Sequence, residues 1–317
     1  MLVKEGYKLL QDEYWTIAGA ILESTISGYV SIFDYHILPV IGEDEINDID
    51  YYELQNYYDN LSNQGYSPKT IRNINQALAS LLKWCWKKRF LKVPVSLKDI
   101  IILPKKRGGN DIKNVISQSE YNELSKHMTG HYKYAIEFIA STGIRFEEIG
   151  ILKENVDFEK KAIYIKTAIK RVFKEYKTKK STIILSSYLK SAAAYRMVPM
   201  TPDVEKIIKK QLDFLEKSDI KSNFIFCNTQ GNMIHPRNLL RYFHESLKKA
   251  GLPKRGLHSL RKLYITRMVK NGMKPKILQK IVGHEEYSTT MKYYANVTAE
   301  DTLSAALDIY NKENGIQ

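Results

Sequence analysis

Cysteine is scarce in this chain. Only Cys85 and Cys227 occur among its 317 residues, and they stand far apart. A disulfide framework requires several cysteines at patterned spacings, and a thiolate zinc site requires cysteines only a few positions apart. Neither pattern is present, which excludes both classes of protein. We expect both cysteines to be reduced and buried in a cytoplasmic protein.

Long apolar runs are also missing. No uninterrupted apolar segment approaches the roughly 20 residues of a membrane-spanning helix. The segment Met1–Gly6 lacks the apolar core of a signal peptide. Low-complexity tracts are absent too, and hydrophobic residues make up 44% of the chain, which is enough for real cores. We therefore expect a folded protein with no membrane association.

Negative charge is in deficit. The chain has 35 acidic residues against 49 lysines and arginines, for a formal net charge of +14. A basic surface favours a polyanionic partner, because neutralising phosphates releases condensed counterions. A basic protein without such a partner is the alternative. The length itself predicts two domains rather than one.

Residues 1–104 predict a small helical domain. Ser67 can cap a helix that has Pro68 at its first position, an arrangement that favours a helix start. Earlier helices are expected at Ile26–Leu38, ended by Pro39 and Gly42, and at Asp50–Leu61. The helix after Ser67 has one apolar face, formed by Ile71, Ile74, Leu78, Leu81, Leu82 and Cys85.

The opposite face of that helix is polar. Its first half offers candidates for contacts in a DNA groove, namely Lys69, Arg72, Asn73 and Gln76. A solvated helix face is the competing interpretation.

A basic segment separates this region from the rest. Residues 105–114 have no apolar period and predict a linker. A second domain is expected over 115–317, opening with Ser117 and Glu120 in a capping-box arrangement. The linker either lies against DNA phosphates or is solvated, and its basic residues are Lys105, Lys106 and Arg107.

The second domain mixes helices with short strands. A largely apolar helix is expected at about Tyr132–Ala140, and a turn at Gly143 places Arg145 at the start of the next helix. From Thr201 onward the pattern is helical again. The predicted fold is therefore mainly α with two domains, the second an α+β domain with a small antiparallel sheet. Its strands are predicted at Lys161–Ile165, Arg171–Tyr176, Thr182–Leu185 and Tyr195–Pro199.

Five side chains in this domain suit one chemistry. Cleaving a phosphodiester needs charge neutralisation, a nucleophile and a proton for the leaving oxygen. Arg145 and Arg261 can bind phosphate bidentately, because guanidinium presents a planar, permanently charged fork. His258 shares a helix face with Arg261, and His284 can add a donor. Tyr294 would supply the nucleophile. Each residue alone is weak evidence; the order and spacing together are specific.

The chain resembles the tyrosine recombinases of the phage integrase family. The Thr-Gly-Leu-Arg-x-x-Glu box of the family is matched by Thr142–Glu148, and His-x-Leu-Arg by His258–Arg261. Leu-Gly-His appears as Val282–His284, and the terminal tyrosine pattern as Thr289–Val297. Leu189–Pro199 is similar to the segment that holds the family's hairpin lysine. Residues 1–104 resemble the family's core-binding domain.

The resemblance implies a site-specific recombinase. Tyr294 would attack a phosphate to give a 3′-phosphotyrosyl link, with Lys190 as general acid on the 5′ oxygen. A partner strand then reverses the step through a Holliday junction. Neither a metal nor another cofactor is required. The other implied catalytic residues are Arg145 and Arg261, which clamp the phosphate, and His258 and His284.

Two of these assignments have rivals. Leu189 replaces the proline that usually precedes the hairpin lysine, and the rivals of Lys190 are Lys177, Lys179 and Lys180. Tyr293 precedes Tyr294 directly, and a spacing of nine residues after the Gly-His histidine would select it. The Tyr-x-His-Val register selects Tyr294.

The implied partners are duplex DNA with specific sites and three further copies of the chain. Glu300–Tyr310 predicts a helix with one apolar face, and relatives dock such a tail on a neighbouring protomer. Docking in cis is the alternative. A type IB topoisomerase and a catalytically inactive DNA-binding accessory factor remain rival functions. Integration, excision and resolution of a mobile element all stay open.

Overall fold

The computed structural model describes residues 1–15, 23–104, 115–175, 180–189 and 192–295, and positions 307, 310, 311 and 314. The chain divides into two compact units. The first unit is Met1–Asn110 with Arg171–Thr182, and the second is Asp111–Lys170 with Ile183–Gln317.

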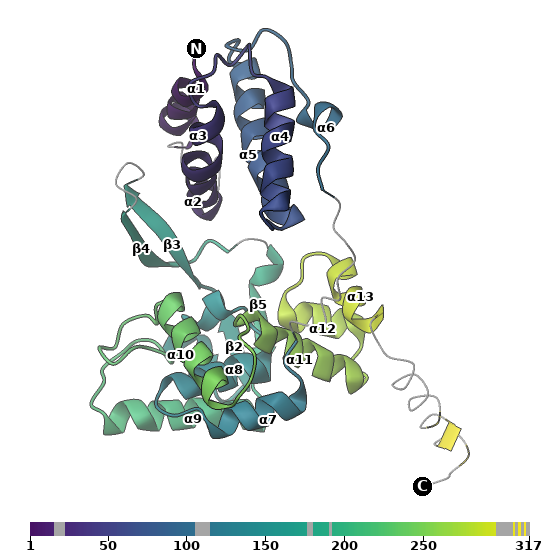
Figure 1. The fold of residues 1–317 in the computed structure, drawn as a ribbon. Coiled ribbons are helices and arrows are strands. Elements are labelled where there is room, and N and C mark those ends of the chain that lie inside the picture. Colours follow the sequence, from purple (N-terminus) through teal and green to yellow (C-terminus); the bar gives the residue numbers. More distant parts are fainter. Residues whose placement is uncertain are drawn as a thin grey trace. The chain divides into compact units, whose positions relative to one another are not determined.

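The first unit is built of helices around one core (Figure 1). Ser67 accepts a hydrogen bond from the backbone N–H of Thr70, as a capping serine should. Asp50 caps another helix by accepting from Tyr52 and Glu53. The elements are α1 (Val3–Leu10), η1 (Gln11–Trp15), α2 (Glu23–Ile32), η2 (Phe33–Ile37), α3 (Leu38–Ile41), α4 (Tyr51–Asn63), α5 (Pro68–Lys87) and α6 (Leu97–Ile100).

Of the two predicted stops, Gly42 is confirmed as the residue that ends the helical run, whereas the stop at Pro39 is wrong. The chain continues helically from Glu23 to Ile41, passing through the π-helical segment η2 before α3. Pro39 lies in the first turn of α3, where the fixed φ of proline suits the helical backbone. A proline therefore need not end a helix when the preceding turn is already widened.

The apolar face of α5 forms the centre of this unit. All six residues predicted for that face are buried, including Cys85, which is a free thiol. Tyr7, Trp15 and Phe33 pack beside it, with Tyr7 and Phe33 stacked at 4.3 Å between ring centroids. The predicted helix therefore serves as the scaffold of the unit.

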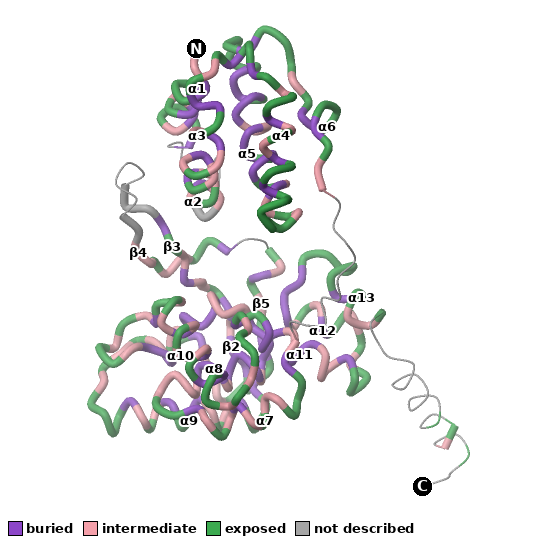
Figure 2. Tube along the Cα trace, in the orientation of Figure 1, coloured by how far each residue is buried: buried purple, intermediate pink, exposed green. Residues whose placement is uncertain are grey.

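The second unit surrounds helix α8 (Tyr132–Thr142), whose residues are largely buried (Figure 2). Helices α9 (Pro202–Lys217) and α11 (His258–Lys270) pack against it. The other elements are α7 (Gln118–Lys126), η4 (Phe146–Ile149), η5 (Lys153–Asn155), η6 (Ala192–Ala194), α10 (Pro236–Lys249), α12 (Pro275–Val282) and α13 (Tyr287–Ala295).

The strands form two small sheets. An antiparallel sheet has the order β1-β2-β5, with Ile163 opposite Val198, and β3 pairs with β4. The predicted strands are thus confirmed, with boundaries shifted by a few residues. They are β1 (Val156–Asp157), β2 (Ala162–Ile165), β3 (Ala168–Glu175), β4 (Lys180–Ser186) and β5 (Arg196–Pro199).

A second, smaller core lies between α11, α12 and α13. It is separate from the main core and comprises Tyr264, Ile265, Val269, Leu278 and Val282, with Tyr293 and Tyr294 packed against it.

Candidate active site

Arg145 is held in place by the turn that ends α8. Gly143 closes that helix in the left-handed conformation, with φ of 66°. A Cβ there would lie 2.3 Å from a ring carbon of Tyr264, so only glycine fits. Arg145 then caps η4, and its guanidinium donates to Glu148 at 2.9 Å and to the Gly283 carbonyl at 2.6 Å. The predicted next helix is a single 3-10 turn, and Arg145 stands at its start.

Arg261 is the largest fully buried side chain among the described residues. Its Nη1 donates to the carbonyl oxygen of Gly143 at 2.8 Å. Its Nε and Nη2 are buried and have no hydrogen-bond partner within the described part of the chain. Unpaired buried donors are costly, so two N–H groups on a cation indicate a place that an anion fills.

Two histidines border the arginines. His258 begins α11, and His284 follows Gly283, the left-handed glycine that ends α12. The Nδ1 atom of His284 lies 2.9 Å from the hydroxyl of Thr290 on α13. Burial and then the charges of Arg261 and Arg145 lower the pKa of His284 to about 3. His284 is therefore a neutral imidazole at pH 7.

His258 shows the same effect at a more open position. Its side chain is exposed by surface area, yet desolvation against its neighbours, followed by the charges of Arg261, Lys262 and Arg145, lowers its pKa to about 4. Positive charge around the imidazole disfavours its protonated form. Both imidazoles can therefore accept a proton or donate an N–H at neutral pH.

Glu148 supplies the negative charge that holds the arginines. It is 3% exposed and accepts from Arg145 and from both Nη atoms of Arg196, at 2.9 and 2.7 Å. Burial opposes its ionisation, but the hydrogen bond and charge of Arg196 and the charge of Arg145 lower the pKa of Glu148. One carboxylate thus orients two cations.

Arg196 was assigned no role by the sequence analysis. Its Nε donates to the Ile281 carbonyl at 2.7 Å, so it ties β5 to the end of α12. The signal was present, because Arg196 matches the arginine of the family's lysine-containing segment. What the sequence lacks is any sign that this arginine would pair with Glu148.

The two tyrosines of α13 point to different partners. Tyr293 lies nearly parallel to the His284 ring, with 6.3 Å between centroids and 18° between planes. The Tyr294 hydroxyl donates to the carbonyl oxygen of Met273, in the turn before α12. The predicted nucleophile Tyr294 therefore has its hydroxyl engaged in that turn, while its neighbour adjoins the histidine.

Several predicted site residues lie outside the described part of the chain. Lys190 is one of them, and the end of β4 and the start of η6 flank it. Of the predicted tail helix, Leu307 and Tyr310 are described, and both are exposed. The linker residues Lys105, Lys106 and Arg107 also lie outside, as do the rival lysines Lys177 and Lys179. The backbone of Lys180 is described, but its side chain is not.

The groove-contact candidates of α5 are described and belong to the first unit. Lys69, Asn73 and Gln76 are exposed. Arg72 is half-buried and donates to the Pro104 carbonyl at 2.9 Å, so it also anchors the chain that leaves this unit.

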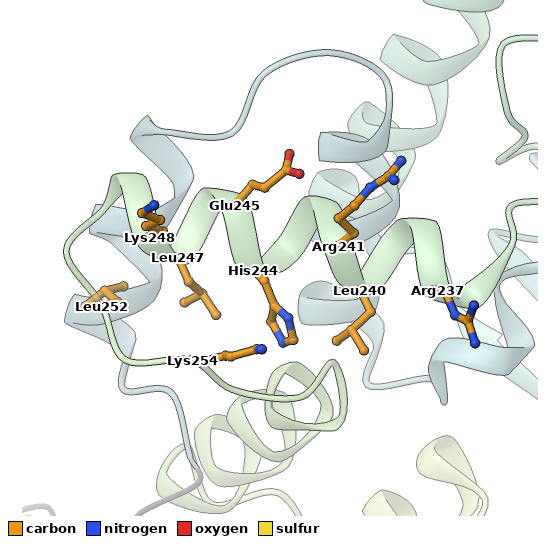
Figure 3. Close-up of a pocket in the computed structure, with 9 residues that line it drawn as sticks. All are labelled: Arg237, Leu240, Arg241, His244, Glu245, Leu247, Lys248, Leu252 and Lys254. Carbon is orange, nitrogen blue, oxygen red and sulfur yellow. The ribbon is translucent and has the colours of Figure 1, made fainter.

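A groove lined by several cationic side chains runs along α10 (Figure 3). Arg237, Arg241 and Lys248 recur along one side of the helix, and Lys254 follows in the next loop. The groove encloses about 720 Å³, and none of the cluster residues described above lines it. The spacing of these cations was visible in the sequence, which makes them a missed candidate surface.

The described residues contain no cluster of three or more side chains suited to a metal ion. Among them, no helix is both long and apolar enough to cross a membrane.

Comparison with known families identifies the fold. The model of the phage integrase family matches residues 114–300, and that of the phage integrase N-terminal SAM-like domain matches residues 17–62. The chain therefore belongs to the phage integrase family and is a tyrosine recombinase.

Individual relatives are distant. A tyrosine recombinase XerC-like protein of Caldanaerobacter subterraneus subsp. tengcongensis is 26% identical over 275 residues, covering 80% of this chain and 68% of that protein. The transposase from transposon Tn916 of Enterococcus faecalis is 27% identical over 221 residues, covering 63% and 52%.

Solved structures share the fold. The Tn1549 transposon integrase in complex with a circular intermediate DNA aligns with a TM-score of 0.74 at 18% identity, covering 98% of this chain and 99% of that one. A λ integrase dimer bound to a COC′ core site aligns with a TM-score of 0.70 at 15% identity, covering 93% and 95%.

Proposed function

We propose that this phage integrase family member is a site-specific recombinase that cuts and rejoins duplex DNA through a 3′-phosphotyrosyl intermediate. The observation that carries the proposal is the buried guanidinium of Arg261: its Nε and Nη2 have no hydrogen-bond partner among the described residues, and its charge interacts with that of Arg145. A phosphodiester supplies the missing acceptors and the missing negative charge.

The cluster is preorganised for an anion. The arginines are fixed by backbone carbonyls and by Glu148 before any substrate arrives. Donors that need no rearrangement stabilise the extra charge of a phosphoryl transition state more than water does. Burial and the neighbouring cation Arg145 lower the pKa of Arg261 to about 9, so it keeps its proton at pH 7.

In the proposed cleavage step, one phosphate ester is exchanged for another. A tyrosine oxygen of α13 bonds to phosphorus as the bond between phosphorus and the 5′ oxygen breaks. The phenol proton passes to a neutral imidazole of the cluster, His258 or His284, and the 5′ oxygen takes a proton from Lys190. The 5′ hydroxyl of a partner strand then attacks in reverse. Because the new ester conserves the bond energy, ATP is not needed.

Duplex DNA is the proposed partner. Family membership and the net charge of +14 support it. We propose backbone or groove contacts by α5, by the linker over 105–114 and by the cationic groove of α10. Residues 1–104 would act as the core-binding domain and 115–317 as the catalytic domain. A tetramer joined through the tail at Glu300–Tyr310, acting through a Holliday junction on a mobile element, completes the proposal.

Trapping of a covalent adduct tests the function. Nicked duplexes that tile the DNA flanking the gene for this chain are incubated with the protein in EDTA, so that a cut releases a short strand and cannot be resealed. We expect a DNA-linked band on a denaturing gel. Arg145→Ala should reduce it by about 100-fold or more, whereas Lys209→Ala on α9 should not change it.

The same experiment separates the rival functions. Absence of any adduct from the wild type across the tiled duplexes would favour an accessory DNA-binding role. An adduct together with relaxation of supercoiled plasmid that lacks the cleaved site would favour a type IB topoisomerase.

A further inference from the structure

Helix α13 carries two adjacent phenols, Tyr293 and Tyr294. Successive side chains on an α-helix diverge by about 100°, so the two hydroxyls cannot approach the same phosphorus in one placement of the helix. The helix is fixed by contacts with α11 and α12. Its placement therefore decides which phenol faces the arginines.

Tyr293 is the phenol on the side of the cluster. Its ring lies beside His284, the histidine that burial and the arginine charges keep neutral. A phenolate at Tyr293 would favour the charged form of Arg261. Thr290, one turn earlier on α13, contacts the same histidine. The Tyr293 face of the helix is thus the face that borders the phosphate donors.

Tyr294 is turned to a different group. Its hydroxyl donates to the Met273 carbonyl, in the turn between α11 and α12. A phenol that donates to a carbonyl must keep its proton, and burial raises the pKa of Tyr294 further. Both features oppose nucleophilic attack. The same hydrogen bond ties the C-terminal turn of α13 to the turn before α12.

We propose that Tyr293 is the nucleophile of this recombinase and that Tyr294 is a positioning residue, whose hydrogen bond to Met273 sets the rotation of α13. The inference rests on the proposed function. In the cleavage step the Tyr293 oxygen bonds to phosphorus, the bond to the 5′ oxygen breaks, and the phenol proton passes to His258 or His284. The Tyr294 hydroxyl keeps its proton throughout.

Direct mapping of the adduct tests the nucleophile. The nicked duplexes that tile the flanking DNA are reacted with the full chain, the adduct is digested with nuclease and trypsin, and tandem mass spectrometry locates the modified tyrosine. We expect the modification on Tyr293. Modification of Tyr294 would overturn the inference while leaving the proposed function intact, and absence of any adduct would remove the function itself.

Variants test the positioning role. Tyr293→Phe should abolish the adduct. Tyr294→Phe should retain it on Tyr293 but slow single-turnover cleavage by about 10-fold, the effect of losing roughly 1.4 kcal/mol of orientation in the transition state. DNA affinity should not change. Tyr287→Phe, on the same helix and partly exposed, is the matched control and should cleave at the wild-type rate.

A structural role alone would give a different result. If Tyr294→Phe lowers the melting temperature and leaves the rate on the folded protein unchanged, Tyr294 is only a packing residue and the positioning role is wrong. If cleavage is slowed in Tyr294→Phe and partly restored in Tyr294→His, whose imidazole carries its own N–H donor, the hydrogen bond to Met273 is supported.

Discussion

Arg145 donates from Nη2 to the carbonyl oxygen of Gly283, 138 positions further along the chain. Arg261 makes the complementary contact by donating to Gly143, two residues before Arg145. Arg145 is thus fixed by the glycine next to His284, and Arg261 by the glycine two residues before Arg145. The interlocking explains how residues from three helical segments keep one geometry without a bound anion.

Gly283→Ala should disable the site. The backbone there has φ of 69°, and a Cβ would lie 2.8 Å from the Ala193 carbonyl and 2.9 Å from Cδ of Arg196. The left-handed conformation alone costs about 1 kcal/mol for a non-glycine residue. We expect a larger loss of stability by chemical denaturation, together with a loss of covalent adduct.

Gly272→Ala separates the cost of a left-handed backbone from the cost of a steric clash. Gly272 has φ of 73°, but nothing lies within 4 Å of its added Cβ. Its variant should lose only the cost of the backbone conformation and retain cleavage. Equal effects of the two variants would contradict a role for the crowded contact at Gly283.

Glu148→Ala should destabilise the second unit. It leaves Arg196, 5% exposed, without its carboxylate and removes a partner of Arg145. Breaking a buried ion pair from one side costs about 3–5 kcal/mol. Urea unfolding measures the loss. Glu123→Ala, which removes an exposed pair with Lys126, serves as the control and should leave the unfolding midpoint unchanged.

The histidines predict a pH dependence. In the folded protein the pKa of His284 is lowered to about 3 and that of His258 to about 4, against 6.5 without burial. Between these values the unfolded chain binds more protons. The contribution of these two histidines to the free energy of unfolding is therefore fully present above pH 6.5 and is lost as the pH falls below that value. Thermal unfolding from pH 7.5 to 4.5 should show the decline.

His284→Asn should make that dependence shallower, because it removes one of the two groups with a lowered pKa. If the wild type and His284→Asn decline in parallel, the carboxylates rather than these imidazoles control acid stability.

The groove of α10 predicts a salt effect. Replacing Arg237 and Arg241 by alanine should weaken duplex binding similarly for every sequence and reduce the salt slope of affinity by about 2. Fluorescence anisotropy at several salt concentrations measures this. The double variant of Lys209 and Lys217 on α9 removes the same charge, and an equal loss there would show that the effect is one of net charge alone.

Sequence patterns predicted the local features well. The cap at Ser67 and the apolar face of α5 depend on neighbours within one or two turns, and both appear as expected. Order and spacing also singled out Arg145, Arg261 and both histidines, which lie close enough together in the structure for their charges to interact. The family and the mainly helical fold are confirmed.

Long-range contacts escaped the sequence. The pairing of Arg196 with Glu148 joins residues 48 positions apart, and no local pattern encodes it. The orientation of α13 depends on packing against α12, so a motif register could not decide between Tyr293 and Tyr294. The prediction that Pro39 ends a helix failed because a π-helical segment directly upstream, which the sequence pattern does not indicate, allows the helical chain to continue.

The helix with the phenols rests on a core of its own. Five buried residues hold α11, α12 and α13 together, whereas the main core of the unit is far larger. Local opening requires only the free energy of the contacts that are broken, so α13 should exchange its amide hydrogens faster than α8. Under the proposed function, so lightly anchored a helix would allow its phenol to withdraw from the phosphate after one strand is cut.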